Sequence, residues 1–254
     1  MLFRPYPASP SFEPALLRRL AAALRVLLPS ACAQCGEAGG PVCADCRAQY
    51  FSGSLPRCRQ CAIPLPGQDG ATARCGACLR SPPAFDATIA VSDYAAPADG
   101  LVLALKFGGR LALAPALASL LHAAVLRRTD LALPTVLAAV PLSRGRLAER
   151  GFNQALEIAR PLAASLGIAL APRLASRLRE TQAQTTLPLE QRRANMRAAF
   201  AIPADAAAQV RGAHIGVVDD VMTTGATLDE LAGVLKRLGA ARVTNLVFAR
   251  TLPH

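Results

Sequence analysis

The residues best suited to chemistry lie in the stretch VVDDVMTTGATLDE, residues 217–230. Asp219 and Asp220 close an apolar run, and neighbouring carboxylates at the end of a buried strand can accept hydrogen bonds from two sugar hydroxyls. The turn TTGAT, residues 223–227, then opens a helix. The free N–H groups and positive end of that helix, with the threonine hydroxyls, can hold a phosphate, and Gly225 allows close backbone approach. The pattern predicts a pocket for a ribose 5-phosphate.

A purely structural role fits each part of this stretch taken alone. The two aspartates could cap a turn, and Thr227 could cap the helix that follows. We favour the ligand site because adjacent carboxylates, a glycine and several hydroxyls occur together in one short string.

A second group of reactive residues is the set of eight cysteines, which all lie between positions 32 and 78. They form four Cys-x-x-Cys pairs: Cys32/Cys35, Cys43/Cys46, Cys58/Cys61 and Cys75/Cys78. Two such pairs supply the four thiolates of a closed tetrahedral zinc site, so the spacing predicts two structural Zn²⁺ sites. Sequential pairing would group the first four and the last four cysteines, and interleaved pairing fits the spacing as well.

Disulfides and an iron–sulfur cluster are the competing interpretations of these cysteines. No secretory signal accompanies them, which disfavours disulfides, and four regularly repeated pairs match iron–sulfur spacings poorly. A segment of about 50 residues with few large apolar side chains needs a metal to fold. Contact with nucleic acid or protein is an additional role that the spacing leaves open.

The overall composition indicates which classes of binding partner to expect. The net charge of +11 and the pI of 10.0 favour a polyanion, either nucleic acid or a phosphorylated small molecule. Basic residues are spread along the chain, so most of them are expected to form a solvated surface. Aromatic residues make up 4% of the chain and tryptophan is absent. Binding of single-stranded DNA would therefore depend on phosphate contacts and weaken steeply with salt.

Membrane insertion is not expected, because no stretch reaches about 18 uninterrupted apolar residues. The apolar run at 15–30 is broken by Arg18, Arg19 and Arg25, and no cleavage-like region follows it. We interpret it as a short amphipathic helix and expect a cytoplasmic protein.

Three parts are predicted along the chain: an N-terminal amphipathic helix or arm (1–31), a double zinc ribbon (32–80) and an α/β domain (81–254). In the last part, strand-like segments such as ATIAVSDY, PTVLAAVPL, HIGVVDDV and RVTNLVFAR alternate with helical ones. This alternation predicts a mostly parallel sheet flanked by helices, with ligands at the carboxyl ends of the strands.

The string VVDDVMTTGAT resembles the phosphoribosyl-pyrophosphate (PRPP) signature of type I phosphoribosyltransferases. Together with the cysteine-rich segment, LKFGGR (105–110), VPLSRGRLAERGFNQA (140–155) and ETQAQTTLPLEQRRANMRAAF (180–200), it resembles the ComF family of competence-associated proteins. The resemblance implies a type I phosphoribosyltransferase-like fold, and an association with DNA uptake and competence partners. It also implies PRPP contacts from Asp219, Asp220, Thr223, Thr224, Gly225, Ala226 and Thr227.

The segment 141–153 follows a strand and precedes a helix, which is where enzymes of this type contact pyrophosphate. Arg144, Arg146 and Arg150 suit that role because guanidinium groups match phosphate oxygens. Gly151 would let the backbone approach the anion. Residues 176–200 fall where such enzymes carry a hood over the substrate, and six arginines between 173 and 197 could close over pyrophosphate. Lys106 is a weaker candidate.

A transferase of this kind would let an acceptor attack C1 of the ribose and displace pyrophosphate, with Mg²⁺ chelated by PRPP and arginines stabilising the leaving group. The sequence provides no base-recognition segment, and the three histidines lie away from the motifs. The acceptor is therefore not predicted. Two other hypotheses remain: a PRPP-sensing accessory protein that binds single-stranded DNA, and a protein whose ribbons dock a competence partner.

Overall fold

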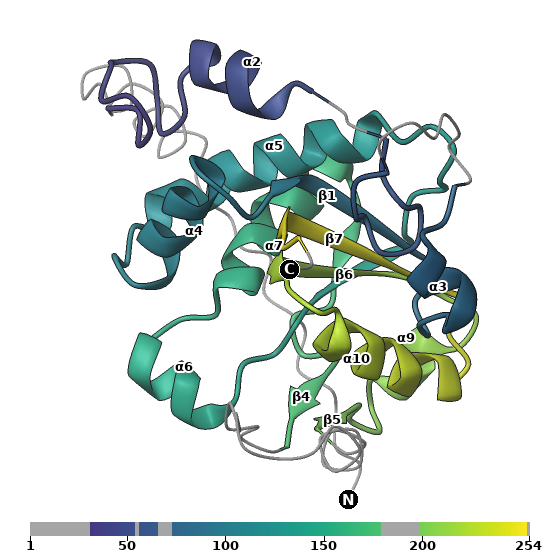
Figure 1. Cartoon of the computed structure of the whole chain (residues 1–254). Coiled ribbons are helices and arrows are strands. Elements are labelled where there is room, and N and C mark those ends of the chain that lie inside the picture. Colours follow the sequence, from purple (N-terminus) through teal and green to yellow (C-terminus); the bar gives the residue numbers. More distant parts are fainter. Residues whose placement is uncertain (1–30, 54–55, 66–72, 179–198, 253–254) are drawn as a thin grey trace, which may run out of the picture.

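The computed structural model describes residues 31–53, 56–65, 73–178 and 199–252 (Figure 1). The predicted N-terminal helix, residues 1–30, lies outside the described residues. So does most of the predicted hood, of which 176–178 and 199–200 are described.

Five parallel strands form the central sheet, in the order β1-β7-β6-β2-β3. Their bounds are Ala87–Asp93 (β1), Val136–Ala139 (β2), Ala169–Leu170 (β3), His214–Met222 (β6) and Arg242–Arg250 (β7). Strand β7 is buried along almost its whole length, as expected for a strand covered on both faces. The predicted mostly parallel sheet is confirmed.

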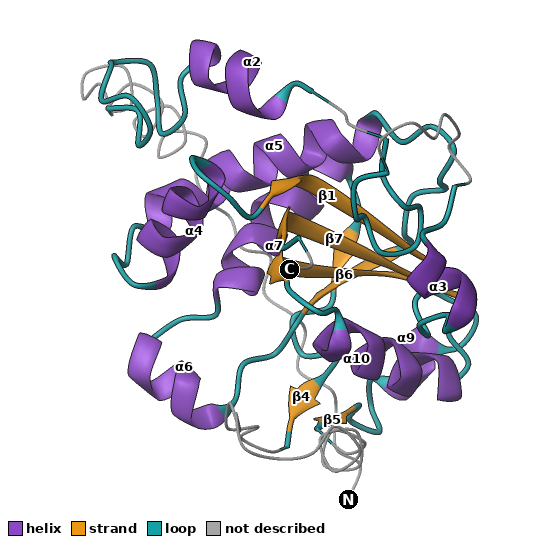
Figure 2. Ribbon diagram, in the orientation of Figure 1, coloured by secondary structure: helices purple, strands orange, loops and turns teal. Residues whose placement is uncertain are grey.

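Helices cover both faces of this sheet (Figure 2). On one face, α5 (Ala114–Leu126) and α7 (Gln154–Leu166) pack their apolar sides against the strands. On the other face lie α9 (Ala207–Val210) and α10 (Ala226–Arg237). The sequence alternation thus produces the three-layer arrangement expected of an α/β fold.

A short helix pair precedes α5. Helix α4 (Ala98–Lys106) ends just before the glycine pair at 108 and 109, and a single 3₁₀ turn, η1 (Leu111–Leu113), leads into α5. A Cβ atom at Gly108 would lie 2.7 Å from the carbonyl oxygen of Ala104, so glycine permits this tight helix end. Lys106 lies in the last turn of α4, just before this helix end.

The cysteine-rich segment packs along edge strand β1, with one part on each face of the sheet. Its first part, including α2 (Ala44–Phe51), joins the core on the α5 face, where the rings of Phe51 and Phe248 lie 5.9 Å apart. Its second part, including α3 (Gly76–Arg80), joins the core on the α10 face. Between them, the backbone N–H of Thr88 in β1 donates to the carbonyl of Arg59.

Candidate functional site

Two of the predicted motifs meet at the carboxyl edge of the sheet. Strands β2 and β6 are direct neighbours, and the N–H of Val140 donates to the carbonyl of Val218 at 3.0 Å. The segment 141–153 therefore starts beside Asp219, at the edge where parallel sheets bind ligands.

The acid pair lies near the end of β6, and its two side chains point to opposite faces because successive strand residues alternate. Asp220 is 2% exposed, and its Oδ2 lies 3.0 Å from the Nζ of Lys106. Asp219 is half-buried. Each carboxylate also accepts a hydrogen bond from the next backbone N–H, Asp220 N at 2.9 Å and Val221 N at 2.7 Å. Lys106, the weaker sequence candidate, is thus a direct partner of the pair.

Burial raises the pKa of Asp219 well above its usual value, and the charge of Asp220 raises it further. The N–H of Asp220 and the ammonium of Lys106 act in the opposite direction. A ligand that donates hydroxyl hydrogen bonds to Asp219 would favour its ionised form. Ligand binding and proton release are therefore expected to be coupled here.

The threonine turn is open to solvent between β6 and α10. Thr223 and Thr224 are exposed, and the Oγ1 of Thr224 accepts a hydrogen bond from Ala226 N at 3.3 Å. Gly225 has φ +87°, and a Cβ atom there would come within 2.5 Å of the Met222 methyl carbon. Gly225 is the N-cap residue of α10, so the structure does not give Thr227 the capping role that was the alternative.

The arginine segment, residues 141–153, contains a short helix of its own, α6 (Arg144–Arg150). Ser143 caps it by accepting a hydrogen bond from Arg146 N at 3.4 Å. Gly151 ends it with φ +78° and donates its N–H to the carbonyl of Leu147. The glycine therefore has a left-handed helix-ending role.

The three predicted arginines differ in their surroundings. Arg144 and Arg146 are exposed. Arg150 is half-buried, donates to Gln154 Oε1 at 2.7 Å, and places its guanidinium 5.4 Å from the centre of the Phe107 ring. Two of the three are thus presented to solvent, where an anion could reach them.

Asn153 fixes the end of this segment. Its Nδ2 donates to the carbonyl of Val140 at 3.0 Å, and its Oδ1 accepts hydrogen bonds from Ala155 N and Leu156 N. The residue caps α7 and ties the segment back to the end of β2. This structural task accounts for an asparagine at this position.

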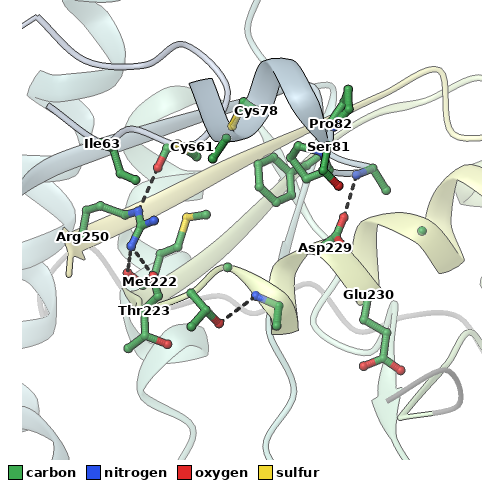
Figure 3. A pocket seen from close by; sticks show the side chains of 18 of the residues that line it. Cys61, Ile63, Cys78, Ser81, Pro82, Met222, Thr223, Asp229, Glu230 and Arg250 are labelled. Atoms are coloured by element: carbon green, nitrogen blue, oxygen red, sulfur yellow. Dashed lines mark hydrogen bonds between the residues drawn. The ribbon is translucent and has the colours of Figure 1, made fainter. Parts of the chain in front are cut away.

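Two cavities lie near these motifs. One of about 750 Å³ runs along α6 and the start of α7, and Arg144 and Arg177 line it. The other, of about 1350 Å³, lies between the second cysteine set and α10, and Thr223 and Thr224 line it (Figure 3). The structure places the arginine helix and the threonine turn on different cavities.

The charge of Arg177 in β4 (Ser176–Arg177) interacts with the arginine helix, through Arg146, and with the acid pair, through Asp219. Strand β4 pairs with β5 (Phe200–Ala201) at the base of the predicted hood. Burial lowers the pKa of Arg177, as does the nearby charge of Arg146, while Glu230 and Asp219 raise it. Arg177 was one of the six hood arginines considered from sequence.

Sequence reasoning missed two charged residues around the turn. Arg250, the last residue of β7, is 5% exposed and donates to the carbonyls of Met222 and Thr223. Glu230 in α10 accepts a hydrogen bond from Ala199 N at 2.7 Å, and burial raises its pKa. A charge directly after the apolar run LVFA, at the end of the predicted strand RVTNLVFAR, was the available signal for Arg250.

Both four-cysteine sets fit zinc. The structure gathers them sequentially, with the sulfurs of each set within 4.8 Å of one another: Cys32, Cys35, Cys43 and Cys46, then Cys58, Cys61, Cys75 and Cys78. The Sγ atoms of Cys35 and Cys43 lie 3.7 Å apart, and those of Cys61 and Cys75 3.6 Å. Zinc–sulfur bonds of about 2.3 Å in a tetrahedron require sulfurs about 3.8 Å apart. Of the two pairings that spacing allowed, the sequential one is observed.

Backbone N–H groups point at the sulfurs in both sets. Cys43 N donates to Cys32 Sγ at 3.3 Å, and Cys75 N donates to Cys58 Sγ at 3.3 Å. These donors favour thiolates, the form that binds zinc.

Among the helices in the described ranges, none combines the length and apolarity needed to span a membrane.

Comparison with known sequences agrees with this geometry. The double zinc ribbon domain matches residues 23–79, and the phosphoribosyl transferase domain matches residues 150–251. The DNA utilization protein YhgH of Salmonella typhi is 39% identical over 214 residues, covering 83% of this chain and 91% of that protein. The chain belongs to the ComF family. Competence protein F of Haemophilus influenzae, another relative, is 32% identical over 205 residues, covering 80% of this chain and 87% of that protein.

Solved structures similar to this ComF protein include phosphoribosyl enzymes. Glutamine PRPP amidotransferase from B. subtilis aligns with 52% of this chain and 25% of its own, at 16% identity and a TM-score of 0.35. Hypoxanthine phosphoribosyl transferase from Trypanosoma cruzi aligns with 57% of this chain and 74% of its own, at 12% identity and a TM-score of 0.34.

Proposed function

We propose that this protein binds PRPP with Mg²⁺ at the carboxyl edge of the sheet and transfers its phosphoribosyl group to an acceptor, releasing pyrophosphate. The observation that carries the proposal is the solvent-open threonine turn at the start of α10, directly after the acid pair of β6. A phosphate-binding turn beside carboxylates that accept hydrogen bonds from hydroxyls matches a ribose 5-phosphate.

Each group has a role in this proposal. The turn 223–227 binds the 5-phosphate, and Asp219 accepts hydrogen bonds from the ribose hydroxyls. Asp220 is held in place by its ion pair with Lys106 at 3.0 Å. Arg144, Arg146 and Arg150 stabilise the leaving diphosphate as the bond between C1 and its oxygen breaks and the acceptor bonds to C1. Mg²⁺ brought by PRPP would neutralise diphosphate oxygens. The arginine helix and the turn line different cavities, so an extended ligand would have to bridge from one to the other across β6 and β2.

The biological setting is proposed from the named relatives, a DNA utilization protein and a competence protein. We place the activity in DNA uptake or use, on the cytoplasmic side. Zinc–thiolate sites suit that compartment because its thiols are kept reduced.

Titration calorimetry of PRPP with Mg²⁺ tests the binding site. The Asp219→Asn/Asp220→Asn variant should bind more than about tenfold more weakly, because hydrogen bonds to charged acceptors are lost. Asp86→Asn is the matched control, since Asp86 accepts a hydrogen bond from Val243 N near the start of β7, at the opposite edge of the sheet. Equal affinity of wild type and the double variant would remove the assignment.

The raised pKa of Asp219 gives a pH test. The folded protein binds this proton more tightly than the unfolded chain, so its stabilising contribution is present at low pH and lost as pH rises through the Asp219 pKa. PRPP affinity should rise over the same pH range, because the ionised carboxylate accepts hydrogen bonds from the ribose hydroxyls. In Asp219→Asn the pH dependence of PRPP affinity should lack this contribution and follow only the titration of the ligand. A wild-type profile identical to that of Asp219→Asn would contradict the role.

Catalysis is tested by pyrophosphate release. The full-length protein would be incubated with PRPP, Mg²⁺ and a panel of bases and nucleosides, with the Asp219→Asn/Asp220→Asn variant as the blank. Acceptor-dependent release in wild type alone supports transfer. PRPP binding without release from any acceptor would favour the accessory role instead.

The net charge of +11 supports a second candidate, a PRPP-sensing accessory protein that binds single-stranded DNA. Arg74 and Arg80 are exposed on the second ribbon. If the ribbon contacts DNA phosphates, Arg74→Gln/Arg80→Gln should weaken oligonucleotide binding and reduce its dependence on salt. Unchanged salt dependence would exclude this surface.

A further inference from the structure

Arg250 connects the second zinc site to the threonine turn. Its Nε donates to the carbonyl of Cys61 at 2.9 Å. Its Nη1 donates to the carbonyls of Met222 at 3.1 Å, of Thr223, and of Thr251 at 2.6 Å. Figure 3 shows the guanidinium between the two segments, with Cys61 on one side and Met222 and Thr223 on the other. A zinc ligand and the start of the turn are thus held by the same side chain.

The chemistry of this contact makes it a rigid one. The guanidinium is planar, so its donors have fixed directions and fix the carbonyls that they meet. Arg250 is 5% exposed, and water does not readily replace these bonds. Any movement of the Cys61 carbonyl would cost the charged group a hydrogen bond or shift the carbonyls of Met222 and Thr223.

A second set of contacts runs in parallel. Gln60, inside the Cys58–Cys61 motif, donates to the carbonyls of Phe85 at 3.1 Å and Pro83 at 3.3 Å. Between those two residues, Ala84 N donates to Asp229 Oδ1 in the first turn of α10 at 2.6 Å. The second zinc site is therefore connected to both sides of the turn.

The first zinc site has different neighbours. Gln34, inside the Cys32–Cys35 motif, donates to the carbonyl of Pro97 at 2.9 Å, next to α4. Phe51 packs against Phe248 on the α5 face. These contacts lie on the opposite face of the sheet from α10.

We infer that Arg250 is a positioning residue through which the metal-filled second site, and not the first, holds the turn 223–227 ready for phosphate. The inference deepens the proposed function and, for its affinity test, rests on it. It predicts that the order of the turn, and the part of ligand affinity that the turn supplies, depends on the second zinc site.

The first experiment compares two arginines that both tie the second ribbon to the sheet. Arg57 donates to the carbonyl of Ala62 at 3.0 Å and to Asp93 of β1 at 2.7 Å, whereas Arg250 also donates to the carbonyls of Met222 and Thr223. PRPP affinity, measured by calorimetry on the zinc-loaded full chain, should fall about tenfold in Arg250→Lys and change less than about twofold in Arg57→Lys. Equal affinity of Arg250→Lys and wild type, or equal losses in both variants, would overturn the inference.

The second experiment needs no PRPP and so separates this inference from the proposed function. Cys75→Ser and Cys35→Ser each remove one of the more accessible ligands, from the second and the first site respectively. Amide hydrogen exchange at 223–227 should accelerate about tenfold in Cys75→Ser and Arg250→Lys, and stay unchanged in Cys35→Ser. Amides in the centre of β6 report any global unfolding. The inference would be refuted if protection of the turn amides were the same in all variants, or were lost equally in both cysteine variants.

If wild type shows no PRPP binding, the proposed function fails while the exchange result still decides the inference. If wild type binds PRPP and the two experiments show no preference for the second site, the function stands and the inference fails.

Discussion

The two zinc sites have the same ligands and nearly the same sulfur separations, yet they are attached to different parts of the protein. The glutamines Gln34 and Gln60 occupy equivalent positions in CAQC and CRQC. Gln34 bonds to Pro97 before α4, whereas Gln60 bonds to the segment that contacts α10. Ligand spacing therefore determines that a metal binds, and the surrounding contacts determine which functional element depends on it.

The largest expected difference between the sites is in stability. Cys58 is fully buried and Cys35 is exposed. Cys58→Ser should lower the free energy of unfolding by more than about 4 kcal/mol, because structural zinc contributes directly to folding. Cys35→Ser should cost less, since water can reach the altered ligand. Chemical unfolding together with zinc analysis measures both, and equal losses would mean that the two sites contribute alike.

The attachment of the first site can be weakened without touching its ligands. Phe51 is 3% exposed and contacts Phe248 of β7. Phe51→Ala should destabilise the protein by about 3 kcal/mol through lost burial and the remaining cavity. Urea unfolding measures the change, and zinc analysis should still find two ions per chain. A fall in zinc content would show that packing and metal binding at this site are not separable.

The paired glutamines provide the finest comparison. Gln60 is 5% exposed and bonds to two carbonyls, so Gln60→Ala should cost about 2 kcal/mol. Gln34 is half-buried with one such bond, so Gln34→Ala should cost about 1 kcal/mol or less. Thermal unfolding of both variants gives the order. The reverse order would contradict the stronger attachment of the second site.

Much of the fold could be predicted because its elements have strong local signals. The segment RVTNLVFAR forms β7 with the expected bounds, and HIGVVDDV lies within β6. The glycines at 108 and 109 separate α4 from α5, in keeping with the low helix propensity of glycine. In contrast, α6 has seven residues and none of them is buried, so it has no apolar periodicity to reveal it.

The site was predictable only in part, for a different reason. The acid pair, the threonine turn and the arginine segment are local strings, and the structure brings the acid pair and the arginine segment to one sheet edge through the β2–β6 pairing. Arg250 bonds to Cys61, which lies 189 positions away in the chain, and no local pattern encodes that contact. The choice between sequential and interleaved cysteine sets likewise depends on three-dimensional packing. The domain boundary near residue 81 stays a prediction, although both cysteine sets pack into the cores beside the sheet.

The hydrogen bond between Thr88 N and the carbonyl of Arg59 has a consequence for handling the protein. Strand β1 is the outer strand of the sheet on that side, and the ribbon backbone covers it. An uncovered strand edge is a template for pairing with another copy. Chain produced without enough zinc should therefore collect as insoluble aggregates, and supplying the metal during synthesis should increase the yield of dispersed protein.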